Sequence, residues 1–281
     1  MGCHFSTQTR QMKIPVLISA HRKGRQLECI LTGYVMQKRP ADQLILAPDG
    51  MDPAIVVAMN AAQAQGWRLS LLHPTRPQSG VGHYRALDCA ILAADGELLL
   101  ITDGDGIARD DYLAKDLRRM RRAICLAGGG HISIPERYRL RHDLRPEMRD
   151  PSLFQYRRLS ALPRFRKSST PLARALDLLR PRNANSCASR CALRGDVLAV
   201  GGFAAMMGYG GGLNLGLRLH HVGVRGVRAQ HALASLHWDH GRSDYCADGE
   251  RAHHGWHRAV RQARLVLARA SQIRSLAGAA P

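Results

Sequence analysis

The chain has 281 residues and a formal net charge of +19, and 45% of its residues are hydrophobic but only 5% aromatic. This length suffices for one large α/β domain, alone or with a subdomain, and the charge favours an anionic partner such as a nucleotide, a nucleic acid or an acidic membrane surface. The seven scattered cysteines give no disulfide framework, and no run approaches the roughly 18 apolar residues of a membrane span.

Strand and helix patterns alternate over the first hundred residues. Short apolar runs are separated by segments with helical spacing, which predicts βαβ units and a mostly parallel sheet flanked by helices. We expect strands at 15–20, 43–47, 68–72 and 97–102, with helices at 25–37, 51–65 and 82–94. The positions expected to face the core are Leu27, Ile30, Leu31 and Tyr34 on the first helix and Leu87, Ala90 and Ile91 on the third.

The pattern is less regular beyond the fourth strand. Asp110 and Asp111 suit the start of a helix that we expect to reach residue 127, before a short strand at 131–134. Residues 135–182 are rich in Arg and Pro, and we expect either an ordered insert that binds an anion or a mobile lid. The remaining predictions are a helix at 213–221, a strand at 229–236 and a basic helix at 249–276.

Two carboxylates, Asp103 and Asp105, follow the apolar run 98–101 with only Gly104 between them. Ligands of open α/β sheets bind beyond the carboxyl ends of the strands. Two acids placed there would suit a divalent cation, which could bridge to a phosphate, and the glycine would let a ligand approach the backbone. An ordinary polar turn would have the same composition, so the residues alone leave both interpretations open.

Several blocks in this order resemble family 2 glycosyltransferases, the nucleotide-sugar-dependent enzymes of GT-A fold. In the first half they are residues 15–22, 49–50, 85–97 and Asp103-Gly104-Asp105. In the second half they are residues 194–203, 208–220 and 237–240, a half that is similar to galactosyltransferases of this fold.

The resemblance implies a GT-A, Rossmann-like α/β fold with a C-terminal acceptor-side subdomain. Its implied parts are a nucleotide-sugar-binding half at 14–134, an insert or lid at 135–182, an acceptor-side half at 183–240 and a basic C-terminal helix at 249–276.

The resemblance also implies a nucleotide site. His21 lies in the loop after the first strand, and Asp49 would bind the base. Arg85 and Asp88 would line the nucleotide side, and Asp103 would contact the ribose or a metal ion. The residues by themselves leave two alternatives: Asp49 as a turn-forming residue before glycine, and Asp88 as an acid on the surface of a helix.

The implied cofactor is Mn²⁺ or Mg²⁺, which would neutralise the diphosphate leaving group. Asp103 and Asp105 would bind this ion, and His237 or His240 could complete its shell. Both histidines could equally be ordinary buried or surface residues.

One departure concerns the catalytic base. Relatives that invert the sugar carry Glu-Asp after Gly-Tyr-Gly-Gly, whereas Gly211 is followed here by Gly212-Leu213-Asn214. Loss of a general base typically costs about a hundredfold to ten-thousandfold in rate. Asp196 and Asp239 are the candidates to replace it.

The sequence therefore predicts a glycosyltransferase that moves a sugar from a nucleotide diphosphate sugar to a saccharide or lipid-linked acceptor, in surface polysaccharide or glycolipid synthesis. The alternatives are a catalytically weak nucleotide-sugar-binding or partner protein of the same fold and, least favoured, a nucleic-acid-binding protein. Because the first 13 residues lack the apolar core of a signal peptide, we expect a cytoplasmic protein, with the basic tail able to contact the acidic inner face of the membrane.

Overall fold

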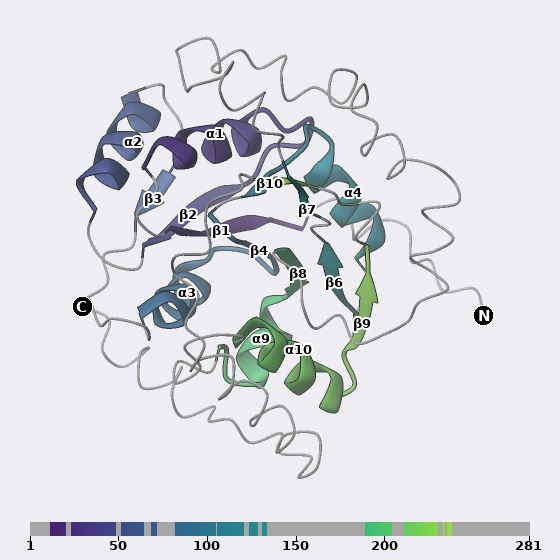
Figure 1. Ribbon diagram of the computed structural model, residues 1–281. Coiled ribbons are helices and arrows are strands. Elements are labelled where there is room, and N and C mark those ends of the chain that lie inside the picture. Colours follow the sequence, from purple (N-terminus) through teal and green to yellow (C-terminus); the bar gives the residue numbers. More distant parts are fainter. Residues whose placement is uncertain are drawn as a thin grey trace.

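Helices lie on both faces of a mostly parallel sheet in the part of the chain that the structure describes (Figure 1). In this computed structural model, the described residues are 12–20, 24–48, 52–64, 69–71, 82–104, 106–120, 124–128, 131–133, 189–203, 211–229, 233 and 235–237. The predicted insert at 135–182 and the predicted tail helix at 249–276 fall outside these ranges. No helix within them is long and apolar enough to cross a bilayer.

The larger sheet has seven strands in the order β3-β2-β1-β4-β8-β6-β9. All neighbouring pairs are parallel except those of β8, which runs antiparallel to both β4 and β6. This confirms the predicted mostly parallel α/β sheet. The strands are β1 (Pro15–Ala20), β2 (Gln43–Pro48), β3 (Leu69–Leu71), β4 (Leu98–Thr102), β6 (Ile124–Gly128), β8 (Ser189–Leu193) and β9 (Arg225–Arg228).

A second, smaller sheet joins segments that lie far apart in the sequence. Its order is β5-β10-β7, with β5 (Gly106–Ile107) antiparallel to β10 (Ser235–His237) and β7 (His131–Ser133) parallel to it. The chain thus returns, close to its described end, to the residues that follow β4.

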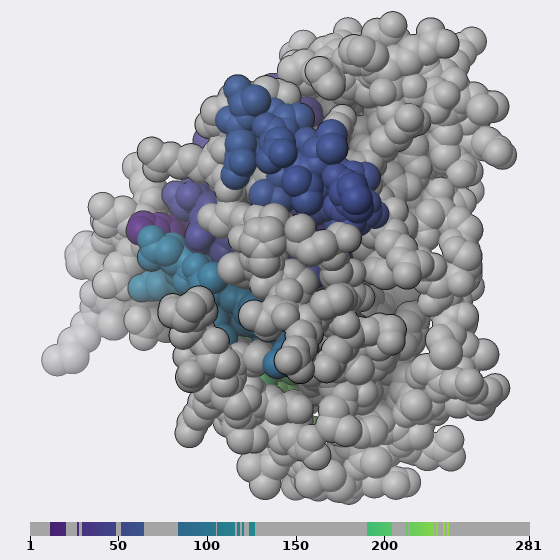
Figure 2. All heavy atoms as spheres, turned by 90° about the vertical axis from the view of Figure 1, so that its left-hand side faces the viewer, coloured from purple at the N-terminus to yellow at the C-terminus, as the bar shows by residue number. Residues whose placement is uncertain are grey.

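The helices form a layer on each side of the larger sheet. Figure 1 shows α1, α2 and α4 on one side and α3, α9 and α10 on the other. Figure 2 shows the side of the molecule on which α2 lies above α3. Their bounds are α1 (Gly24–Val35), α2 (Pro53–Ala64), α3 (Gly82–Ala93), α4 (Tyr112–Arg119), α9 (Arg194–Ala199) and α10 (Gly211–His221).

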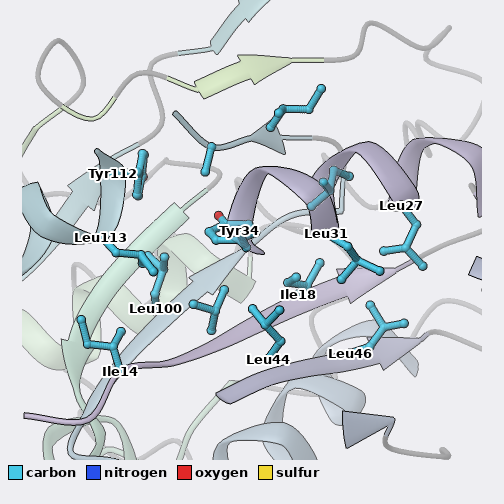
Figure 3. Close-up of a cluster of buried hydrophobic side chains, with 14 of the residues drawn as sticks. Ile14, Ile18, Leu27, Leu31, Tyr34, Leu44, Leu46, Leu100, Tyr112 and Leu113 are labelled. Carbon is cyan, nitrogen blue, oxygen red and sulfur yellow. The ribbon is translucent and has the colours of Figure 1, made fainter. Parts of the chain in front are cut away.

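The core is divided by the sheet into two apolar layers. Alternate strand residues face opposite sides, so that Ile18 and Leu100 belong to one layer and Leu17 and Leu99 to the other. Figure 3 shows the first layer, in which α1 packs on the strands. The predicted core positions of α1 and α3 are all at most 2% exposed: Leu27, Ile30, Leu31, Tyr34, Leu87, Ala90 and Ile91.

Two predicted elements were wrong. The helix expected to reach residue 127 ends at Arg119, because residues 124–128 form strand β6 between β8 and β9. Short apolar runs are ambiguous between strand and helix, and pairing on both sides decides for strand. The strand expected at 229–236 was wrong in its start: its last residues belong to β10 (Ser235–His237), whereas the Leu233 N–H donates to the Ala229 carbonyl oxygen (2.7 Å).

Candidate functional site

The carboxyl ends of three parallel strands lie at one edge of the larger sheet. The register pairs Ala20 of β1 with Pro48 of β2, and Ile18 of β1 with Thr102 of β4. Buried apolar residues on both faces of the sheet hold these strands side by side. In open α/β sheets, this is the edge at which ligands bind.

Three predicted site residues come next in sequence after these strand ends. His21 follows β1, Asp49 follows β2 and Asp103 follows β4. Asp103 is half-buried, whereas His21, Asp49 and also Asp105 lie outside the described residues. The register supports the convergence of the three segments, and the individual roles of His21 and Asp49 stay predictions.

The turn after β4 lies directly against the end of β1. The Gly106 N–H donates to the Asp103 carbonyl oxygen (3.5 Å), which reverses the chain within three residues. A Cβ at Gly104 would overlap the carbonyl oxygen of Ser19 and lie 3.3 Å from the Cα of Ala20. Only glycine allows this approach, and it holds Asp103 at the shared edge of β1 and β4.

The smaller sheet brings a second predicted segment to this turn. His237 of β10 is paired with Gly106 of β5, the residue directly after Asp105, and Leu236 is paired with Ile107. A Cβ at Gly106 would lie 3.4 Å from the Ser235 hydroxyl oxygen, so the two strands are in close contact. The backbone pairing therefore brings the His237 position next to the acidic turn.

The residue types gathered here fit a divalent cation. Carboxylate oxygens such as those of Asp103 and Asp105 suit Mg²⁺ and Mn²⁺, and an imidazole such as that of His237 is a further common ligand. No group of three metal-ligating side chains occurs among the side chains that the structure describes, a set that excludes Asp105, His237 and His240. The ligand assignment therefore stays a prediction, supported by the backbone placement.

Helix α3 brings its first turns to the same edge. Only residues 94–97 separate α3 from β4, so the helix ends at the amino edge of the sheet and begins at the carboxyl edge. Arg85 lies in these first turns and is exposed. This placement is compatible with the predicted contact between Arg85 and an anionic nucleotide.

Asp88 lies further along α3 and faces the interior. Its side chain is 1% exposed, and its Oδ1 accepts a hydrogen bond from the Phe203 N–H (2.7 Å). Burial raises the pKa of Asp88 to about 7, although this hydrogen bond and the positive charge of Arg218 lower it. The alternative of a helix-surface acid was therefore wrong, and the described contact of Asp88 is with the protein backbone.

Arg218 of α10 was not singled out from the sequence, yet it is fully buried beside this site. Its guanidinium donates to the carbonyl oxygens of Val200 and Gly202 and to Asn214 Oδ1, the last at 2.8 Å. The available signal was an arginine within a Leu-rich helical stretch, four residues after an asparagine. Such a pair shares one face of a helix, and an arginine there needs several buried acceptors.

The first turn of α10 contains none of the acids that the family resemblance would place before this helix. Residues 211–214 are Gly-Gly-Leu-Asn, and a Cβ at Gly212 would lie 3.0 Å from Arg190 Nη2. Arg190 is paired with Ile101, one residue before the end of β4. The start of α10 is thus close to the candidate site, but it offers no carboxylate as a base.

Asp196 is not brought to this edge. It lies in the first turn of α9, directly after Leu193 of β8, which pairs with Leu98 at the amino end of β4. Asp103 follows the opposite end of β4. Burial raises the pKa of Asp196, but its position argues against a role as the base, and Asp239 lies outside the described residues.

An open, mostly parallel α/β sheet with an acidic turn at the carboxyl ends of its strands is the arrangement of a Rossmann-like fold, the class to which GT-A proteins belong. The model of the family "Glycosyl transferase family 2" matches residues 16–182, and the chain belongs to this family. The match ends before residues 194–240, so the similarity of that half to galactosyltransferases stays a prediction. Among curated protein sequences, none matches the chain.

Solved structures of glycosyltransferases share this fold. The chain is similar to a mannosyltransferase from Pyrobaculum calidifontis in complex with GDP-Man and Mn²⁺, at 15% identity and a TM-score of 0.56, over 83% of this chain and 58% of the other. TarS from S. aureus in complex with UDP has 10% identity and a TM-score of 0.55, over 81% and 61%.

Glucosyl-3-phosphoglycerate synthase from Mycobacterium tuberculosis, in complex with Mn²⁺, UDP-glucose and phosphoglyceric acid, has 16% identity and a TM-score of 0.50, over 86% of this chain and 77% of the other. The chain thus spans less than two thirds of the mannosyltransferase and TarS chains. At these identities the similarity shows the fold.

Proposed function

We propose that this protein transfers a sugar from a nucleoside diphosphate sugar to an acceptor hydroxyl, at the carboxyl edge of its larger sheet. The observation that carries the proposal is the pairing of His237 with Gly106, which supports a site formed by the Asp103–Asp105 turn and the late histidines. Family membership supports the reaction class. The similar mannosyltransferase structure contains GDP-Man and Mn²⁺, and the similar TarS structure contains UDP. Both support a nucleotide sugar as donor.

In this proposal Asp103 and Asp105 hold Mn²⁺ or Mg²⁺, with His237 or His240 as a further ligand. When bound, such an ion would supply Lewis-acid stabilisation of the diphosphate leaving group. An imidazole ligand favours Mn²⁺, because Mg²⁺ prefers oxygen ligands and keeps its waters. The resemblance assigns Asp105 to the metal alone, whereas Asp103 would contact the ribose or the metal. We therefore expect the loss of Asp105 to weaken the metal site most.

The chain's own polar residues would then bind and orient the donor. Asp49, after β2, would accept hydrogen bonds from the base, and His21 would line the nucleotide after β1. The exposed guanidinium of Arg85, in the first turns of α3, would attract the diphosphate. Asp88 would act indirectly, because its buried carboxylate contacts the backbone of Phe203.

The acceptor hydroxyl must lose its proton as it attacks the sugar, and a positioned base normally takes that proton. Asp196 is at the wrong end of β4 for this task. Asp239 follows His237 by two residues, and His237 pairs with the residue next to the acidic turn. We therefore assign the role of base to Asp239 in the proposed mechanism.

Calorimetric titration with UDP and GDP, in Mn²⁺ and then in chelator, tests the nucleotide site. We expect one of the two to bind only with metal, and Asp105→Ala to abolish that dependence. Asp95→Ala is the matched control, because Asp95 is an exposed acid whose ion pair with Lys13 (2.8 Å) lies on the surface. Equal binding by Asp105→Ala and the unaltered protein would show that the metal site is misassigned.

One observation favours a second candidate, a nucleotide-sugar-binding protein with weak turnover. The first turn of α10 has no acid, although it begins near the end of β4. Donor turnover separates the two candidates: UDP-glucose and GDP-mannose would be incubated with Mn²⁺, and release of the nucleoside diphosphate measured. Release that Asp239→Ala reduces by about a hundredfold or more would support catalysis with Asp239 as base.

We further propose a saccharide or lipid-linked acceptor, used in surface polysaccharide or glycolipid synthesis. The net charge of +19 supports an anionic acceptor or an acidic membrane surface. Flotation of the full chain and of residues 1–248 with vesicles of acidic or neutral lipid tests the membrane contact. Binding to acidic vesicles that requires residues 249–281 and declines with salt would support the basic tail as the contact.

A further inference from the structure

A single buried peptide group connects two charged side chains from different helices. The N–H of Phe203 donates to Asp88 Oδ1 on α3 (2.7 Å), and the carbonyl oxygen of Gly202, in the same peptide group, accepts from Arg218 Nη2 on α10. Asp88 is 1% exposed and Arg218 is fully buried. When Asp88 is ionised, its negative charge faces the positive end of the peptide dipole, and the positive charge of Arg218 faces the negative end.

The backbone around this peptide group has a shape that favours glycine. Gly201 and Gly202 have φ values of 82° and 67°, in the left-handed region that most side chains avoid. Arg218 also donates to the carbonyl oxygen of Val200 at the end of α9. The turn formed by residues 201–203 is therefore held by Asp88 of α3 and by Arg218 of α10, in addition to its own hydrogen bonds.

The same turn is packed against α3 through an aromatic pair. The rings of Tyr84 and Phe203 stack with centroids 5.2 Å apart and an interplanar angle of 17°. Tyr84 and Asp88 are one helical turn apart, so both hold the turn to a single face of α3. Arg85, the exposed residue next to Tyr84, belongs to the proposed nucleotide side.

We infer that Asp88 and Arg218 are positioning residues, which hold α10 and the turn at residues 201–203 in a fixed orientation on α3. This inference rests on the proposed function, because it assigns the pair to the alignment of the acceptor-side half with the nucleotide-binding half. Both side chains are buried, and their described hydrogen-bond partners are protein groups. Both act through the peptide group between Gly202 and Phe203.

A purely structural role would explain the buried charges less well. Burial of two charges carries a large desolvation cost, and well-packed apolar residues of similar volume often give equal or greater stability. A hydrogen-bonded pair, in contrast, fixes direction, because donor and acceptor must point at each other. Small displacements far from the reacting atoms can lower a rate by roughly a hundredfold.

Substitution of Asp88 tests the inference. Asp88→Ala removes the acceptor of the Phe203 N–H, and we expect the rate of UDP-glucose or GDP-mannose turnover to decline by roughly tenfold to a hundredfold. The affinity for the free nucleotide in Mn²⁺ should stay unchanged, because the Asp88 side chain is buried and accepts from the backbone of Phe203. Asp88→Asn should restore most of the rate, since its amide oxygen can accept the same hydrogen bond.

Three results would overturn the inference. They are an Asp88→Ala variant with an unchanged rate, an Asp88→Asn variant as impaired as Asp88→Ala, or an Asp88→Ala variant that loses nucleotide affinity in proportion to rate. Should Asp88→Ala fail to fold, a second variant tests the same contact between α3 and the turn at residues 201–203. Tyr84 is partly exposed, and Tyr84→Leu removes its stacking contact with Phe203. We expect it to lower the rate by a smaller factor with nucleotide affinity unchanged, and an unchanged rate would count against the link.

Two measurements distinguish failure of the proposed function from failure of this inference: assays of the unaltered protein and amide hydrogen exchange. A folded, unaltered protein that neither binds nucleotide nor turns over donor contradicts the proposed function. Hydrogen exchange at the Phe203 amide then tests the link itself. We expect faster exchange in Asp88→Ala than in Asp88→Asn, and equal exchange in both would overturn the inference.

Discussion

The backbone of Gly104 is in contact with the carbonyl oxygen of Ser19, so that any side chain at position 104 would overlap it. This contact joins the turn after β4 to the last residues of β1 at the carboxyl edge of the sheet. Glycine is therefore required here by space, and this contact keeps Asp103 at the edge where ligands of open α/β sheets bind.

Gly104→Ala should destabilise the protein and weaken nucleotide binding. The added methyl group meets backbone atoms of Ser19 and Ala20, which cannot move without disturbing β1. Overpacking of this kind costs about 1–3 kcal/mol. Urea denaturation measures the loss in unfolding free energy, and titration with UDP and GDP in Mn²⁺ measures the loss in affinity.

Gly195→Ala is the matched control for this substitution. Gly195 lies in the first turn of α9, is exposed, and has no atom within 4 Å of its added Cβ. We expect unchanged stability or a gain of up to about 1 kcal/mol, because alanine is the better helix former. If both glycine variants behave alike, the contact between Gly104 and Ser19 does not constrain the turn.

The stability of the protein should depend on pH through Asp88. Burial raises the pKa of Asp88 from 3.8 to about 7, so between these values the folded protein holds a proton that the unfolded chain has lost. The contribution of Asp88 to the unfolding free energy is therefore fully present below about pH 4. It declines by about 1.4 kcal/mol per pH unit as the pH rises to about 7, and is constant above that.

The groups that face Asp88 do not change charge in this range. Arg218 of α10 stays positive, although burial lowers its pKa to about 10, and Arg190 of β8 acts on it as a second cation. Burial raises the pKa of Cys89 on α3, so this thiol stays neutral. Urea unfolding of the unaltered protein and of Asp88→Asn at pH 5, 6, 7 and 8 isolates the effect. If the difference in unfolding free energy between the two proteins does not vary with pH, the predicted role of Asp88 is contradicted.

Gln37→Leu should destabilise the packing of α1 against the segment before α4. The Gln37 amide donates to the carbonyl oxygens of Gly33 (2.7 Å) and Arg109, and its Oε1 accepts from the Leu113 N–H (3.0 Å). Leucine preserves the volume but leaves these buried backbone groups without their partner, at a cost of about 1–3 kcal/mol.

Unfolding in urea measures this loss, with Asn60→Ala on α2 as the control. Asn60 is exposed, and surface substitutions usually change stability by less than about 0.5 kcal/mol. A Gln37→Leu variant as stable as Asn60→Ala would show that water replaces the lost hydrogen bonds.

The periodic parts of the fold could be predicted from the sequence because local patterns determine them. Leu27 and Leu31 repeat at helical spacing, and both are buried on α1 as expected. β8 had no such signal: Ser189–Leu193 contains an arginine, and its antiparallel pairing with β4 and β6 depends on partners far away in the sequence. Non-local pairing of this kind cannot be read from a short run of residues.

Part of the candidate site could also be predicted from local sequence patterns. Asp103 follows a strand pattern, and its position at the carboxyl edge follows from parallel strand order alone. The burial of Asp88 could not be predicted, because its partner Phe203 belongs to the other half of the chain. Helical spacing places Arg218 on the same face of α10 as Asn214, but it does not reveal the other two acceptors, which are backbone carbonyls beyond α9.

The last prediction concerns His237, whose backbone is paired with Gly106. If its imidazole binds the metal, His237→Ala should weaken Mn²⁺ binding by at least about tenfold, because even the loss of an outer-shell partner has an effect of that size. His220→Ala is the control, since His220 is exposed near the end of α10. Titration of Mn²⁺ in the presence of UDP or GDP, followed by electron paramagnetic resonance, compares the two. An unchanged Mn²⁺ affinity in His237→Ala, combined with a loss in Asp105→Ala, would retain the acidic turn as the metal site and remove His237 from it.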